Sequence, residues 1–184
     1  MDLLTSGPHA NFIFYEFLLY TALERNNRCI KKYEERINNG ITLYKRWSKS
    51  CPENFLNKLL LLEAEIAAIE GNQQSIDLYK EAISSSHKYG FTQEEALACE
   101  RAGVYLLEKN LVEGAYKFFL QSYLSYECWG ATTKMEHLVK NYPLLTDKIK
   151  QSKCELRISF GQLQFDEQSQ ASVSILSDGS FAHT

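Results

Sequence analysis

The sequence predicts an all-α protein built from helical hairpins, with about seven helices in residues 1–150 and a flexible tail in residues 151–184. Three observations lead to this prediction. Apolar residues recur every three to four positions over most of the chain, as they do in amphipathic helices. Glycines follow the ends of several of these periodic segments, where helices commonly stop. A partial internal repeat also relates two of the predicted hairpins.

Composition and charge limit the classes of protein to consider. The chain has 184 residues, of which 45% are hydrophobic and 12% aromatic, enough to bury a sizeable core in one domain. The formal net charge is −3, so there is no overall basic surface for nucleic acid. The apolar segment Phe12–Tyr20 is too short to cross a bilayer, and no membrane span is predicted.

Cysteine usage points to a reducing compartment. The five cysteines are widely spaced, are odd in number and form no Cys-x-x-Cys pair: Cys29, Cys51, Cys99, Cys128 and Cys154. Such a set is typical of reduced thiols in a cytoplasmic protein, several of them buried as small hydrophobic residues.

The first two predicted helices cover Asn11–Leu23 and Cys29–Lys49. The first has almost no polar face, so the core, a partner or a missing domain must cover it on several sides. The second keeps its apolar period through Asn38-Asn39-Gly40, a tripeptide that also favours a turn. We expect one helix with a weak middle; two shorter helices are the alternative.

The next two helices have clear start and stop signals. Ser50-Cys51-Pro52-Glu53 combines a cap-type serine with a proline in the first turn and an early acid, which predicts a helix start. This third helix runs to Glu70 and ends at Gly71-Asn72. The fourth covers Gln74–Lys88 and stops at Gly90.

The last three helices are predicted at Thr92–Asn110, from there to Trp129, and at Thr132–Tyr142. Thr92 and Glu95 have the spacing of a capping box. After Ile149 the chain becomes rich in serine and glutamine, as in linkers and tails. A short strand at residues 156–160 is considered but has no further support.

Helix packing is expected to centre on the sixth predicted helix. Small and large residues alternate along one stripe of this helix, and a glycine on the preceding helix offers a second point of close approach. These predicted packing residues are Gly103, Ala115, Phe119, Ser122, Tyr126 and Trp129. A ligand-stacking groove is the alternative interpretation of the aromatic rings, with core packing preferred.

An internal repeat appears when the chain is shifted by about forty residues. The shift pairs Ser75 with Ala115, Tyr79 with Phe119, Ala82 with Ser122, and Ile66 with Leu106. Two helix-turn-helix units with small residues at matching places are typical of tetratricopeptide-like arrays. The period is longer than the usual thirty-four residues, and no proline closes the unit at Gly90. The predicted architecture is a short tetratricopeptide-like α-solenoid.

No catalytic, cofactor or metal site is predicted. The sequence has no Gly-x-x-x-x-Gly-Lys-Ser/Thr loop and no Gly-x-Gly-x-x-Gly turn, the usual nucleotide-binding motifs. Its four histidines are isolated from one another and from the cysteines, which leaves no metal-ligand cluster. Glu63 and Glu65 face different directions on a helix and make a poor acid/base pair. Glu63 lies in an apolar run and is expected to contact Lys58 or a neighbouring helix end.

An ordered set of short motifs resembles a known family. The motifs are Cys51-Pro-Glu-Asn-Phe55, Leu62-Glu-Ala-Glu65, Tyr79-Lys-Glu-Ala-Ile83, Tyr126, Trp129-Gly-Ala131 and Lys134. They are similar to the helical region of large hybrid sensor histidine kinases, over roughly Phe12–Leu145. In those proteins a protein-kinase-like domain and an AAA-type ATPase precede this region, and a GAF domain and the histidine kinase follow it. The chain lacks the motifs of all these catalytic domains, so the resemblance transfers no activity and implies a fragment or a stand-alone descendant.

These observations favour a non-enzymatic interaction or relay module. Its partners would be another protein or the adjacent domains of a larger signalling protein; the oligomeric state is not predicted. The alternative is a tetratricopeptide-type adaptor that binds peptides in a concave groove lined by polar and basic side chains. An enzyme is the third and least favoured class, because it would need a pocket that gathers titratable groups.

Overall fold

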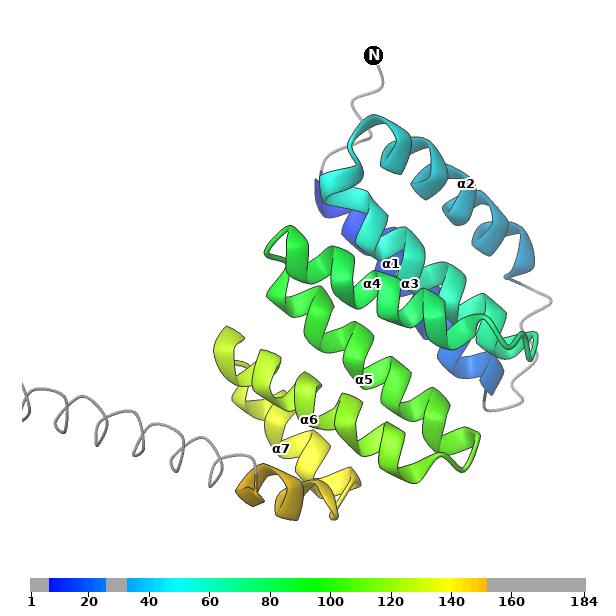
Figure 1. The fold of residues 1–184 in the computed structure, drawn as a ribbon. Coiled ribbons are helices and arrows are strands. Elements are labelled where there is room, and N and C mark those ends of the chain that lie inside the picture. Colours follow the sequence, from blue (N-terminus) through cyan, green and yellow to red (C-terminus); the bar gives the residue numbers. More distant parts are fainter. Residues whose placement is uncertain (1–6, 26–32, 152–184) are drawn as a thin grey trace, which may run out of the picture. The chain divides into compact units, whose positions relative to one another are not determined.

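The computed structural model describes residues 7–25 and 33–151, and most of these residues are helical (Figure 1). The helices are α1 (Gly7–Arg25), α2 (Glu34–Ser50), α3 (Pro52–Ile69), α4 (Ser75–Lys88), α5 (Thr92–Glu108), α6 (Val112–Trp129) and α7 (Thr132–Asn141). Residues 145–151 form a further helical segment. Because the described residues contain no strand, the prediction of an all-α fold is confirmed for this part of the chain.

The chain divides into two compact units, Met1–Asn141 and Tyr142–Thr184. All the contacts discussed below lie within the first unit. Of the predicted tail, only Gln151 falls within the described residues, and the strand considered at residues 156–160 lies outside them.

The predicted bounds of α3 to α7 agree with the structure to within two residues at each end. Helix α2 is continuous through the Asn38-Asn39-Gly40 tripeptide, and its predicted start at Cys29 lies outside the described residues. Gly40 is buried, and a Cβ atom there would lie 3.2 Å from Cγ2 of Ile13. The glycine therefore serves a close approach of α1 to α2 and does not form a turn.

Both predicted side-chain caps are wrong. Helix α3 begins after Cys51, which caps it without a side-chain hydrogen bond, and Ser50 is the last residue of α2; the proline at the start of α3 is confirmed. At α5 the cap is Phe91, whose carbonyl accepts the Glu95 amide at 2.9 Å. The Glu95 carboxylate cannot close a capping box on Thr92 because it bonds to side chains of α4 and α6 instead.

Four helices end in the same way. Residues 71, 90, 110 and 130 all have positive φ, between 59° and 79°, and the amide of the next residue bonds back to a carbonyl five residues earlier. This is the Schellman arrangement, which satisfies the last carbonyls of a helix. Three of the four positions are glycine and Asn110 is the fourth, in keeping with the low cost of a left-handed conformation for these residues. The ends of α3 to α6 thus recur at nearly equal intervals.

Helix starts show the longer period. Helices α3, α5 and α7 begin at Pro52, Thr92 and Thr132, which are forty residues apart. Three of the four predicted pairs match in burial: Ser75 and Ala115, Tyr79 and Phe119, and Ala82 and Ser122 are all fully buried. In the fourth pair Ile66 is half-buried and Leu106 is buried. The α3–α4 and α5–α6 hairpins therefore use the same positions for packing.

Helix α1 departs from the pattern of neighbouring hairpins. It packs mainly against α3 (Figure 1), and its side chains also reach α5: Gln93 donates a hydrogen bond to the Tyr15 hydroxyl, and Arg25 donates one to Glu108 at 2.7 Å. These contacts lie near opposite ends of α5. Helix α1 therefore packs on α3, and long side chains bridge it to both ends of α5.

Candidate functional site

The predicted packing residues lie at the interface of α5 and α6. Ala115, Phe119 and Ser122 are fully buried and Tyr126 is 2% exposed. The Ser122 hydroxyl donates a 2.8 Å hydrogen bond to the carbonyl of Ala96 on α5, so this small polar residue is satisfied where the two helices meet.

Of the two remaining predicted packing residues, Gly103 is tightly packed and Trp129 is not. A Cβ atom on Gly103 would lie 2.6 Å from Cε1 of Phe119, so the glycine makes room for the ring. Trp129, by contrast, is 48% exposed. It is the last residue of α6, and its ring lies tilted against that of Tyr126, with ring centres 6.5 Å apart. The indole therefore lies at the surface and departs from the buried stripe expected of it.

A buried ion cluster joins α1, α3, α4 and α5. At its centre the Glu65 carboxylate of α3 is fully buried. Arg101 of α5 donates to both carboxylate oxygens, from Nε at 2.8 Å and from Nη2 at 2.7 Å, and the Tyr79 hydroxyl of α4 donates at 2.7 Å. Arg25, at the end of α1, pairs with Glu65 at 3.3 Å and with Glu108 at 2.7 Å. Four helices are thus tied to one carboxylate.

The pKa values of this cluster follow from burial and charge. Burial by itself raises the pKa of Glu65, but the hydrogen bonds and charge of Arg101, together with the charge of Arg25, outweigh it and leave this pKa below its ordinary value. Burial and the Glu65 charge raise the pKa of Tyr79. Glu65 therefore stays ionised and Tyr79 protonated. A carboxylate held in this way suits the anchoring of helices better than proton transfer.

Sequence reasoning missed this cluster. It considered Glu65 only as one half of an acid pair, and it expected Glu63 to contact Lys58 or a neighbouring helix end. In the structure Glu63 pairs with Lys45 of α2 at 3.1 Å, whereas Lys58 is buried and pairs with Glu94 of α5 at 2.9 Å. The usable signal was a glutamate inside an apolar run, which needs a buried partner.

Further polar contacts join the later helices. Glu100 of α5 accepts a 2.7 Å hydrogen bond from the Tyr126 hydroxyl and pairs with Lys134 of α7 at 2.7 Å. Glu95 of α5 contacts His87 of α4 and Ser125 of α6. Each of these carboxylates connects α5 to two other helices.

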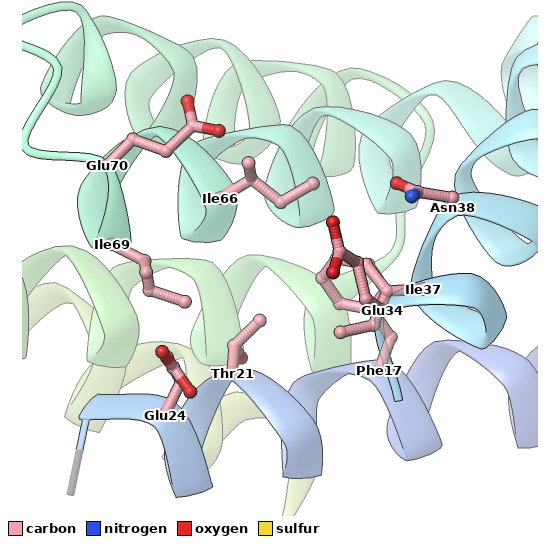
Figure 2. A pocket seen from close by; sticks show the side chains of 9 residues that line it. All are labelled: Phe17, Thr21, Glu24, Glu34, Ile37, Asn38, Ile66, Ile69 and Glu70. Carbon is pink, nitrogen blue, oxygen red and sulfur yellow. The ribbon is translucent and has the colours of Figure 1, made fainter. Parts of the chain in front are cut away.

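An open cavity lies where α1, α2 and α3 diverge (Figure 2). Its volume is about 260 Å³. Four apolar side chains line it, together with a threonine, an asparagine and three glutamates from the three helices: Phe17, Thr21, Glu24, Glu34, Ile37, Asn38, Ile66, Ile69 and Glu70. Since Thr21 already donates to the carbonyl of Leu18, the polar character of the cavity comes mainly from its carboxylates and the Asn38 amide.

An apolar face of α1 is also exposed. Phe12 is 61% exposed, Leu19 56% and Tyr15 42%, and their spacing places them on one side of the helix. The core therefore covers α1 only in part, through Phe14 and Phe17. This answers the question raised by the sequence: α3 and α5 bury one side of this apolar helix, and another side faces solvent.

The described residues offer little for metal or thiol chemistry. Residues 7–25 and 33–151 contain no group of three metal-binding side chains. Burial raises the pKa of the Cys99 thiol, and a hydrogen bond to Glu53 raises the pKa of the half-buried Cys51, so neither of these two thiols is activated as a nucleophile. Within the same residues no helix is long and apolar enough to span a bilayer.

Comparison with known proteins found no match. No family model, curated protein or solved structure is significantly similar to this chain. The functional argument therefore depends on the residues and their geometry.

Proposed function

We propose that this chain is a non-enzymatic interaction and relay module, built as a tetratricopeptide-like α-solenoid. We further propose that it derives from the helical region between the ATPase and GAF domains of hybrid sensor histidine kinases and acts in the cytoplasm. The observation that carries the proposal is the open cavity between α1, α2 and α3, with its apolar floor and polar rim. Such a surface suits the binding of a partner.

The repeated construction supports the solenoid part of the proposal. Helix starts forty residues apart, recurring Schellman ends and matched buried positions in α3–α4 and α5–α6 are what stacked hairpins require. Each hairpin of such an array contacts its neighbours, and the array presents extended surfaces for other proteins.

The proposed descent from the kinase region is supported by what the residues of the resembling motifs do in the fold. Glu65 and Tyr79 come from two of these motifs, and they are hydrogen-bonded to each other. Tyr126 and Lys134 come from two others and share Glu100. The motifs thus contain the side chains that join one helix to another, as expected for a signature of this fold rather than of a catalytic site.

A relay role has a physical basis in the ion cluster. The cavity is bounded by α1 and α3, and Arg25 of α1 and Glu65 of α3 both belong to the cluster that continues to α5. Occupation of the cavity that shifts α1 against α3 would act on the same charges that hold α5. A contiguous network of this kind can carry coupling between a binding surface and distant helices.

The peptide-adaptor alternative fits less well. An adaptor needs a groove lined by free polar and basic side chains. Here α1 lies against α3 and α5, and Tyr15 and Arg25 already bond to side chains of α5. A peptide could use that side of α3 and α5 only by displacing α1.

Site-specific photocrosslinking in living cells tests the proposal. A photoreactive p-benzoylphenylalanine at Asn38, which lines the cavity, should give one discrete protein adduct. The same group at Glu81, exposed on α4 and remote from the cavity lining, is the control and should not give that adduct. Absence of an adduct at Asn38, or equal labelling from both positions, would contradict the proposal.

A further inference from the structure

We infer that the cavity between α1, α2 and α3 is a docking site for a partner segment in which an apolar side chain is flanked by lysine or arginine. This inference rests on the proposed function and names the chemistry of the partner. It is argued from the apolar floor of the cavity, from its size and from the charge of its rim.

The floor of the cavity is apolar and comes from three helices. Phe17 of α1, Ile37 of α2, and Ile66 and Ile69 of α3 line it (Figure 2). Ile69 is 37% exposed although it is a large aliphatic residue. An apolar side chain placed here would cover surface that now faces water, and this burial is favourable.

The size of the cavity suits a single inserted side chain. Pockets for drug-sized molecules usually measure roughly 300–1,000 Å³, and this one measures about 260 Å³. The cavity is open to solvent, so a residue of a passing chain can be inserted from outside.

The charge of the rim selects basic neighbours for that residue. Glu34 and Glu70 lie at the edge of the floor (Figure 2), and none of the described residues that line the cavity is basic. Lysine and arginine suit this arrangement because their methylene stems pack on apolar surface while their charged ends reach carboxylates. These two acids disfavour phosphates, and therefore an anionic lipid surface or a nucleic acid, as the occupant.

The charge of Glu70 lies at a position where it does not stabilise the folded protein. It is the C-cap residue of α3, and a negative charge at the C-terminus of a helix is unfavourable for the helix dipole. Its loss should therefore leave the melting temperature unchanged or raise it. A binding defect in Glu70→Gln could then be assigned to the cavity and not to unfolding.

Fluorescence anisotropy with the full chain tests the inference. The probe is a short fluorescein-labelled peptide, acetyl-Gly-Lys-Leu-Arg-Gly-amide. Two controls replace leucine by serine or both basic residues by glutamate. We expect binding only of the first peptide, and weaker binding at higher salt, since ion pairs at a surface are screened.

Variants then locate the binding. Glu34→Gln and Glu70→Gln should each weaken binding about two- to five-fold, as for exposed ion pairs, and Ile69→Ser should weaken it further. Glu81→Gln, which removes an exposed acid outside the cavity lining, should leave binding unchanged. Circular dichroism of each variant verifies the fold.

Three results would overturn the inference: no binding of the first peptide, equal binding of the serine control, or equal loss in Glu81→Gln. A crosslinked partner at Asn38 without peptide binding would leave the proposed function standing and reject only its basic chemistry.

Discussion

Replacing Gly103 by alanine tests the close packing of α5 on α6. The added Cβ would lie 2.6 Å from Cε1, 2.7 Å from Cδ1 and 3.0 Å from Cζ of Phe119. Real Cβ atoms do not approach carbons so closely, and Phe119 cannot yield easily because it is fully buried and its ring packs edge-on against Tyr116, with centres 5.8 Å apart. The substitution must therefore push the helices apart or force the ring off its rotamer.

Two opposing effects set the size of the loss. Overpacking of a tight core costs about 1–3 kcal/mol, and the short contacts place this site in the upper half of that range. Alanine, however, favours the helix over glycine by about 1 kcal/mol. The net expectation is a loss of about 1–2 kcal/mol in the free energy of unfolding, measured by urea denaturation followed by circular dichroism.

Gly114→Ala is a matched control on α6. Its Cβ would approach only the Leu106 side chain, at 3.2 Å, and a leucine methyl can move aside. This variant should be neutral or up to about 1 kcal/mol more stable than the wild type. In a Phe119→Leu background, Gly103→Ala should lose most of its cost, because the ring is gone. If Gly103→Ala is as stable as the wild type, or costs as much without the ring, the close-packing argument is wrong.

Three further predictions concern burial and charge. Phe119→Ala should lower the free energy of unfolding by about 3–5 kcal/mol, whereas Trp129→Ala, at a half-exposed position, should cost less than about 1 kcal/mol; equal losses in urea denaturation would contradict the assigned burial. Glu65→Gln should cost about 3–5 kcal/mol at neutral pH, because it leaves the largely buried Arg101 guanidinium without its counter-charge, while Arg25 keeps Glu108. A loss below about 1 kcal/mol would show that the cluster contributes little. The pKa of Glu65 is lowered in the folded protein, so its contribution to stability is fully present above the unfolded pKa of about 4.3 and is lost as pH falls through the folded pKa. The difference in unfolding free energy between wild type and Glu65→Gln should therefore shrink below about pH 4. A constant difference would refute the lowered pKa.

Helix positions could be predicted because their signals are local. Periodic apolar residues and the glycines at positions 71, 90 and 130 placed α3 to α7 almost correctly. The Ser50 cap failed because α2 continues through Ser50. The capping box at Thr92 failed because a carboxylate with this spacing bonds wherever tertiary neighbours offer a better partner. For Glu95 those neighbours are His87 and Ser125, which lie on other helices and are not visible from local spacing.

The ion cluster and the cavity could not be predicted because both are made by distant segments. Arg25 and Glu108 are 83 residues apart in the sequence, and Arg101 is 36 residues from Glu65. A single sequence shows that a glutamate in an apolar run needs a partner, but it does not show which cation will reach it. The cavity likewise requires the angle at which α1, α2 and α3 diverge, and periodicity carries no information on that angle.

The α3–α4 and α5–α6 hairpins differ at the positions that contact Arg25 of α1, and this difference suggests what the ion cluster around Glu65 does. At the shift of forty residues Glu65 and Tyr79 correspond to Tyr105 and Phe119, so the second hairpin has two aromatic residues where the first has a hydrogen-bonded carboxylate. If Glu65 only stabilised the hairpin, an apolar residue would serve as well, because buried ion pairs are often no more stable than apolar replacements. In addition, the first hairpin is contacted by α1, because Arg25 of α1 forms an ion pair with Glu65. We therefore interpret Glu65 as the anchor that fixes where α1 lies on α3 and α5, and thereby the geometry of the cavity.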